Sequence, residues 1–112
     1  MKKNELKGIL IREIPIGRKN SVMSKYLEEV AGVKGSTIRD AISDLRAEGV
    51  PICSCANGYF WAESETDVKQ TVAMLNHRCY KMIRASKGME KGYAKKVCKE
   101  AEETMSMDDG NT

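Results

Sequence analysis

Apolar residues recur at helical spacing near the start of the chain and then give way to a break. In residues 4–11 they lie three and four positions apart, which predicts a short helix with one apolar face. Pro15 disfavours the helical conformation at Ile14, so we expect this helix to end there and a short extended segment to follow. The next four residues, 17–20, are predicted to form a polar, basic loop.

Two further helices are predicted on either side of Gly32. The second starts near Met23 or Ser24, where the Ser24 hydroxyl can cap the first turn, and Gly32 ends it because glycine adopts the left-handed conformation without penalty. The third is predicted to begin at Ser36, a second favourable cap, and to end at Gly49. The expected inward stripes are Met23, Leu27, Val30 and Ala31 in the second helix and Ile38, Ala41, Ile42 and Leu45 in the third.

A β-hairpin is predicted to follow the third helix. Residues 50–54 form its first strand, with Pro51 confined to the start or to an edge, and residues 59–62 form the return strand. Asn57-Gly58 between them predicts the turn, since both residues tolerate a positive φ.

A long helix is predicted to begin after Ser64, which forms a variant capping box with Asp67. Its apolar residues alternate spacings of four and three, the heptad period that keeps one face against a partner helix. Gly88 and Gly92 are positions where this helix could kink or end, and residues 94–103 could continue it. The seam consists of Val68, Val72, Leu75, Cys79, Met82, Ser86, Met89 and Tyr93.

The domain organisation follows from these elements. We expect an N-terminal domain over residues 1–63, a long helix over residues 64–103 and a frayed or disordered tail over residues 104–112. The seam could fold back on the N-terminal domain or pair with its twin in a homodimer. Because the seam is long for so small a body, the dimer is favoured.

Charge is unevenly placed along the 112 residues. Residues 1–62 carry ten Lys or Arg and seven Asp or Glu, whereas residues 63–112 carry nine of each, so the net charge of +3 lies in the N-terminal part. This bias favours a polyanionic partner. The sequence has no apolar leader and no stretch near the ~20 apolar residues of a membrane span. Its four cysteines are therefore expected to be reduced thiols in a cytoplasmic protein.

The segment around Gly32 resembles the helix-turn-helix of bacterial and phage DNA-binding proteins. Ala31-Gly32-Val33 followed by Ser36-Thr37-Ile38 matches their turn and the start of their recognition helix, although Glu28 stands where many members have a small alanine. With residues 15–18, 48–54 and 57–59 added, residues 5–65 resemble small winged-helix proteins of prophages and bacterial genomes. The resemblance implies a mainly α fold with a small β-hairpin, a winged helix-turn-helix followed by a long helix. It also implies DNA binding in transcription regulation or DNA replication.

The polar face of the third helix is the candidate DNA-reading surface. Arg39 can pair with O6 and N7 of guanine, and Thr37 can contact a thymine methyl or a phosphate. Ser36 can present backbone N–H groups to a phosphate, Lys34 can contact another, and Asp40 can accept from a cytosine amino group or orient Arg39. An ordinary solvated helix face is the alternative. The whole candidate set is Arg18, Lys19, Asn20, Lys34, Ser36, Thr37, Arg39, Asp40, Ser43 and Asn57.

Two other groups of residues are open to more than one interpretation. The aromatic strand, residues 59–61, could stack on bases, but alternation places at least one of its faces in the core. Cys53 with Cys55, and His77 with Cys79, are potential soft ligands, but each pair is spaced more closely than in structural zinc sites, so no metal is expected. A redox role for Cys53 or Cys55 stays open.

No catalytic constellation, phosphate-binding loop or cofactor motif is present in the sequence. The sequence therefore predicts a non-enzymatic protein that binds double-stranded DNA, as a transcriptional regulator or a phage-type replication factor, and that forms a homodimer through its C-terminal helix. No cofactor, membrane partner or small-molecule substrate is expected. The alternatives are a protein-interaction adaptor and a thiol- or metal-responsive repressor.

Overall fold

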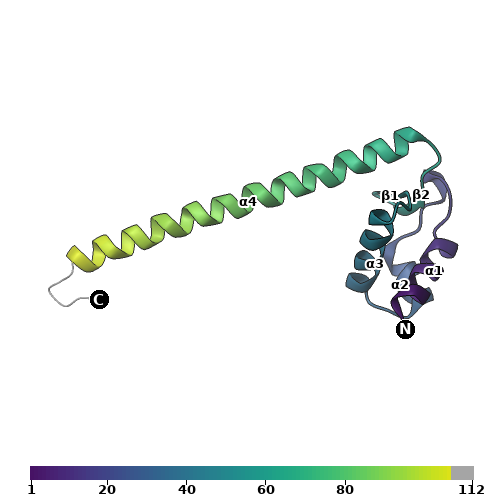
Figure 1. The fold of residues 1–112 in the computed structure, drawn as a ribbon, viewed down its shortest axis with the longest axis horizontal. Helices are drawn as coiled ribbons and strands as arrows, with labels where there is room; N and C mark the ends of the chain where they lie inside the picture. Colours follow the sequence, from purple (N-terminus) through teal and green to yellow (C-terminus); the bar gives the residue numbers. More distant parts are fainter. Residues whose placement is uncertain (107–112) are drawn as a thin grey trace. The chain divides into compact units, whose positions relative to one another are not determined.

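The computed structural model describes residues 1–106 as a mainly helical protein with one small antiparallel sheet (Figure 1). The chain divides into two units, Met1–Ala73 and Met74 onward, and the division falls inside the last helix. This architecture confirms the predicted mainly α class, the small hairpin and the long C-terminal helix. The elements are α1 (Lys3–Glu13), η1 (Arg18–Asn20), α2 (Ser24–Ala31), α3 (Gly35–Ala47), β1 (Ile52–Cys55), β2 (Gly58–Trp61) and α4 (Glu65–Ser106).

The core of the first unit lies where α1, α2 and α3 meet. Each helix contributes a narrow stripe, because only the side facing its two neighbours is removed from water. Phe60 of β2 is also fully buried. The buried helical residues are Leu6, Leu10, Leu27, Ala31, Ile38, Ala41, Ile42 and Leu45. The predicted inward stripe of α3 is therefore confirmed in full.

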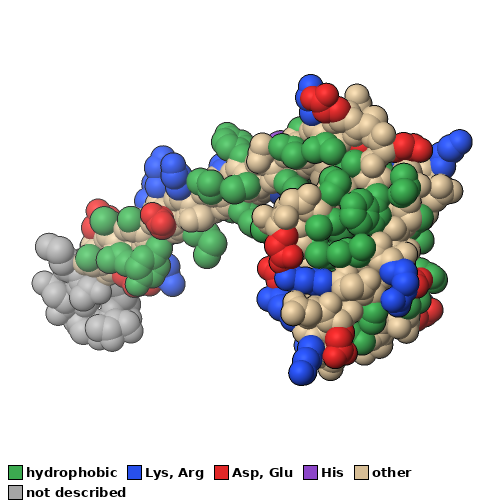
Figure 2. Space-filling view, turned by 45° about the vertical axis from the view of Figure 1, so that its right-hand side comes forward, with side chains coloured by type: hydrophobic (Ala, Val, Ile, Leu, Met, Phe, Trp, Pro, Cys, Tyr) green, Lys and Arg blue, Asp and Glu red, His purple; other side chains and the backbone are tan. Residues whose placement is uncertain are grey.

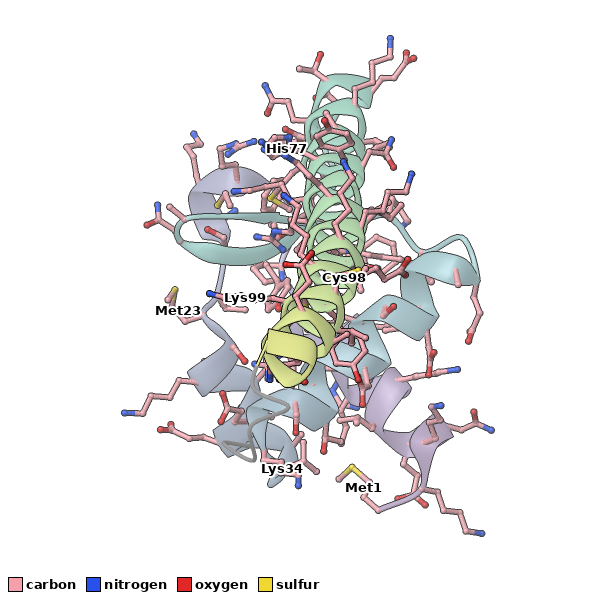
Figure 3. The ribbon with its side chains drawn as sticks, turned by 90° about the vertical axis from the view of Figure 1, so that its left-hand side faces the viewer. Met1, Met23, Lys34, His77, Cys98 and Lys99 are labelled. Atoms are coloured by element: carbon pink, nitrogen blue, oxygen red, sulfur yellow. The ribbon has the colours of Figure 1, made fainter. Side chains whose placement is uncertain are left out.

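The predicted stripe of α2 is wrong at two of its four positions. Met23 is 56% exposed and Val30 is 43% exposed (Figure 3 labels Met23). Met23 precedes the helix as its N-cap, and the eight-residue α2 is short enough that Leu27 and Ala31, one turn apart, carry its buried contacts.

The predicted serine caps of α2 and α3 are also wrong. Ser24 lies inside α2, and its hydroxyl lies 3.1 Å from the carboxylate of Glu28 and donates to it. α3 begins at Gly35 with Lys34 as its N-cap, one residue earlier than predicted, and no side chain caps it.

The sheet pairs β1 with β2 so that Cys55 lies opposite Gly58. The turn consists of Ala56 and Asn57, one position before the predicted pair. Gly58 begins β2 with a φ of +119°. A Cβ at this position would lie 2.0 Å from the carbonyl oxygen of Val22, so the close backbone approach requires glycine.

The other edge of β2 is covered by the segment that joins α1 to α2. Tyr59 exchanges two backbone hydrogen bonds with Val22, at 2.8 and 3.0 Å. Trp61 donates to the carbonyl of Pro15 and accepts from the N–H of Gly17. The predicted extended segment near Ile16 is therefore present as an isolated bridge to Trp61.

Helix α4 begins at the predicted cap. The Ser64 hydroxyl accepts from the N–H of Asp67 at 3.3 Å, and the Asp67 carboxylate accepts from the N–H of Glu63 at 3.0 Å. The helix runs without interruption through Gly88 and Gly92, which neither end nor divide it. Residues 104–106 are helical instead of frayed, and residues 107–112 of the predicted tail lie outside the described residues. Within residues 1–106, no helix is both long and apolar enough to cross a membrane.

Replacing Gly58 with alanine tests the contact with Val22. We expect Gly58→Ala to lower the free energy of unfolding by more than about 2 kcal/mol, because strain at positive φ adds to a clash with backbone. Gly49→Ala is the matched control, since Gly49 also has a positive φ (+97°) but a Cβ there would meet nothing within 4 Å. It should cost about 1 kcal/mol. Urea unfolding followed by Trp61 fluorescence measures both; equal losses would contradict the steric explanation.

Candidate nucleic-acid interface

Helices α2 and α3 are joined by a short turn that Gly32 makes possible. Gly32 adopts the left-handed conformation (φ 70°, ψ 31°), as predicted. Its N–H and that of Val33 both donate to the carbonyl of Glu28, at 2.8 and 3.2 Å. Val33 then packs against the core, so the turn holds α3 in a fixed direction relative to α2.

The polar side of α3 is open to solvent. Ser36, Arg39, Asp40 and Ser43 are exposed and lie three or four positions apart, on the side opposite the buried stripe. Thr37 is half-buried at the edge of this face, and Lys34 is exposed at its start (Figure 3). The structure therefore brings together six of the predicted site residues, five on α3 and one, Lys34, at its N-cap.

Glu28 lies close to the start of α3, which the sequence did not indicate. A Cβ at Gly35 would lie 3.1 Å from the Glu28 carboxylate oxygen and 3.4 Å from Nη1 of Arg39. Glycine at this position therefore leaves room for the Glu28 side chain. The Glu28 carboxylate and the Arg39 guanidinium both lie near this glycine.

The other acidic residue of α3, Asp44, faces α1. Its carboxylate lies 2.7 Å from Nζ of Lys3. The hydrogen bond from Lys3 and the positive charges of Lys3 and Lys7 lower the pKa of Asp44, although desolvation opposes them. Asp44 therefore stays ionised, and its charge is paired with that of Lys3 instead of adding to the exposed face.

The second basic group, residues 18–20, is a turn of 3-10 helix instead of a loop. Arg18 donates to Oε1 of Gln70 at 2.6 Å, and its guanidinium lies 5.2 Å from the centroid of the Phe60 ring. Asn20 donates to the carbonyl of Ile16 at 3.0 Å. All three predicted phosphate contacts are exposed, and two of them, Arg18 and Asn20, also have hydrogen-bond partners within the chain.

The hairpin contributes more to the core than to the open surface. Asn57 is exposed in the turn, as a wing-tip contact requires. Tyr59 and Trp61 are half-buried against the core, and the indole N–H of Trp61 donates to the carbonyl of Ile11 at 3.3 Å. With Phe60 fully buried, the aromatic strand packs the fold on both of its faces.

The four cysteines lie in different surroundings. Cys53 is buried, Cys55 is half-buried, and Cys79 and Cys98 are exposed on α4 (Figure 3). Within residues 1–102, whose side chains are described, no three His, Cys, Asp or Glu residues form a group that could hold a metal ion.

Cys55 has an altered acidity. Burial acts to raise its pKa, but hydrogen bonding with the backbone of Asn57 and with the Ser21 hydroxyl, together with the positive charge of Arg18, lowers the pKa below its ordinary value of 9.0. The Cys55 sulfur lies 3.7 Å from the Ser21 hydroxyl oxygen.

Comparison of the chain with protein-family models, curated proteins and solved structures finds no match.

The acidity of Cys55 can be measured by alkylation. In a Cys79→Ser/Cys98→Ser background, we expect the rate with iodoacetamide to rise with pH to a midpoint below 9.0, because the thiolate is the nucleophile. Removing the nearby positive charge with Arg18→Gln should move this midpoint upward. A midpoint at or above 9.0, or one unchanged by Arg18→Gln, would contradict the assigned cause.

Proposed function

We propose that the first unit is a winged helix-turn-helix domain that binds double-stranded DNA through the exposed face of α3. One observation carries the proposal: α3 buries its whole apolar stripe while Ser36, Arg39, Asp40 and Ser43 are open to solvent. A helix held in this way can enter a major groove while α2 crosses the phosphate backbone. The resemblance of residues 5–65 to winged-helix proteins supports the same assignment.

The charges around Arg39 favour a base contact over a phosphate contact. The Glu28 carboxylate and the Arg39 guanidinium both lie near Gly35, Asp40 is the next residue in the sequence, and carboxylates repel phosphates. An exposed guanidinium on this face can pair with the O6 and N7 acceptors of guanine. Phosphate contacts then fall to Lys34 and to the backbone N–H groups at the start of α3. In this proposal the protein is a non-enzymatic regulator of transcription or a replication factor.

We further propose that α4 pairs with a second copy of itself. Of the predicted seam, Val72, Cys79, Met82 and Met89 are exposed, whereas Val68 and Leu75 are half-buried. Thr71, which lies between these two residues in the sequence, is buried, and its hydroxyl accepts from the N–H of Ser54 at 3.4 Å. The first turns of α4 therefore belong to the N-terminal unit. Tyr93 and Val97 continue the apolar face (green in Figure 2) beyond these residues.

A homodimer would bury this face and bring two copies of α3 to one DNA site. The apolar residues from Val72 to Val97 extend along about 37 Å of helix, at 1.5 Å per residue. Left in water, Met82 and Met89 would expose 67% and 76% of their surfaces. A two-fold dimer predicts a target with two related half-sites.

Arg39→Ala tests sequence reading. Selection from random duplexes yields preferred sites, and Kd is then measured on a selected and a scrambled duplex at one salt concentration. We expect a loss of about 1–3 kcal/mol on the selected duplex and a much smaller loss on the scrambled one. Arg12→Ala, which removes an exposed arginine of α1, should change neither value appreciably. Equal losses on both duplexes, or no duplex binding by the unaltered chain, would refute the proposal.

Met89→Glu tests the dimer. A buried, unpaired carboxylate on the apolar face should convert a dimer to a monomer in sedimentation velocity experiments. Gly88→Glu is the matched control: it adds the same charge one residue away, about 100° around α4 and outside the apolar face, and should leave the dimer intact. If the unaltered chain sediments as a monomer, the apolar face has a different partner.

A further inference from the structure

The zero net charge of residues 63–112 conceals a strong separation of charge along α4. We define residues 77–99 as its basic segment. The segment contains Arg78, Lys81, Arg84, Lys87, Lys91 and Lys95, followed by Lys96 and Lys99, against one acidic residue, Glu90. The balancing acidic residues lie on either side of it, from Glu63 to Asp67 and from Glu100 onward.

The basic side chains also share one side of the helix. At about 100° per residue, Lys and Arg of the segment occupy one half of the circumference, and Met82, Met89 and Tyr93 lie on the other half. Glu90 lies on the apolar side. We call the first half the basic face. All eight of its Lys and Arg side chains are exposed, and Lys96 is paired with Glu100 at 3.7 Å. Figure 2 shows Lys and Arg (blue) along α4 beside the apolar patches.

Two glycines lie within the basic face. Gly88 and Gly92 are one turn apart, and each costs about 1 kcal/mol of helix stability relative to alanine. A Cβ at either position would meet nothing within 4 Å, so no contact of the described chain requires glycine there. They leave a strip of bare backbone between lysines, where a bulky polyanion can approach closely. A twin helix on this side would be repelled by the like charges.

We propose that the basic face of α4 binds the phosphate backbone of DNA, as a second contact besides α3. The inference rests on the proposed function, and it adds the surface that supplies most of the electrostatic attraction. The stretch from Arg78 to Lys99 extends along about 32 Å of helix. A duplex presents a phosphate charge about every 1.7 Å of its axis, so the cations face a continuous line of partners. The basic and apolar faces point in opposite directions and can be occupied together.

An anionic membrane fits the same residues less well. A helix that lies on a bilayer places its apolar face among the acyl chains and its cations at the flanks, near the headgroups. Here Arg84 and Lys95 lie opposite the apolar face and would point into water. The apolar face also includes Ser86 and, beyond Leu75, contains no Trp, Phe or Leu.

The test is the salt dependence of duplex binding by the full chain. In Lys87→Gln/Lys91→Gln/Lys95→Gln, glutamine keeps a helix propensity close to that of lysine. The slope of log Kobs against log[KCl] should become shallower by about 0.9 for each lost phosphate contact, hence by about 2–3. The matched control, Lys87→Arg/Lys91→Arg/Lys95→Arg, keeps the charges and should keep the slope. Circular dichroism checks that both variants retain the helix.

An unchanged slope in the glutamine variant would overturn the proposal. Vesicles of phosphatidylserine and phosphatidylcholine serve as a second probe. Loss of vesicle binding with an unchanged DNA slope would assign the face to lipid and would also overturn it. The outcome is separable from that of the proposed function. If Arg39→Ala leaves sequence preference intact while the glutamine variant flattens the slope, sequence reading by α3 is rejected and DNA binding by α4 is supported. If Arg39→Ala abolishes sequence preference while the glutamine variant keeps the slope, only DNA binding by α4 is rejected.

Discussion

The burial of Ile38, Ile42 and Leu45 against α1 and α2 is the interaction on which the first unit depends. These three side chains are almost fully removed from water, and each contributes about 1.5–3 kcal/mol through burial alone. Because a helix has only one side to bury, fixing this stripe fixes what the opposite side presents. The polar residues Ser36, Arg39, Asp40 and Ser43 are exposed as a direct consequence, and burial of the apolar stripe is enough to account for their exposure.

Electrostatic contacts then distribute charge around this helix. Asp44 forms an ion pair with Lys3 of α1, whereas the Glu28 carboxylate and the Arg39 guanidinium both lie near Gly35 at the start of α3. The exposed side of α3 therefore carries one guanidinium, that of Arg39, with the Glu28 carboxylate near the start of the helix. Such an arrangement favours a specific acceptor over general attraction to phosphate. In our proposals, the basic face of α4 supplies the general attraction to phosphates. Base recognition and phosphate attraction are thus assigned to different helices, α3 and α4.

The C-terminal helix illustrates why the sum of charges is a poor guide to a surface. Nine positive and nine negative residues cancel over residues 63–112, yet their order in the chain separates them, and the helical period gathers the positive ones on one side. The same period gathers Met82, Met89 and Tyr93 on the other. A signal for this face was present in the sequence and would have been found by summing charge over a window of one or two helical turns.

Local spacing by itself determined the helices, the hairpin and the cap at Ser64, because contacts between residues two to four positions apart set these features. Local spacing predicted the wrong first residue for α2 and α3. It also predicted that Met23 and Val30 are buried, whereas both are exposed, since exposure depends on how much of a short helix its neighbours cover. Only the tertiary structure decided that Arg18 meets Gln70 and Phe60, and that Gly58 approaches Val22. These partners lie tens of residues apart in the chain. The periodicity and the caps of one segment do not specify which distant residue it contacts in the folded protein.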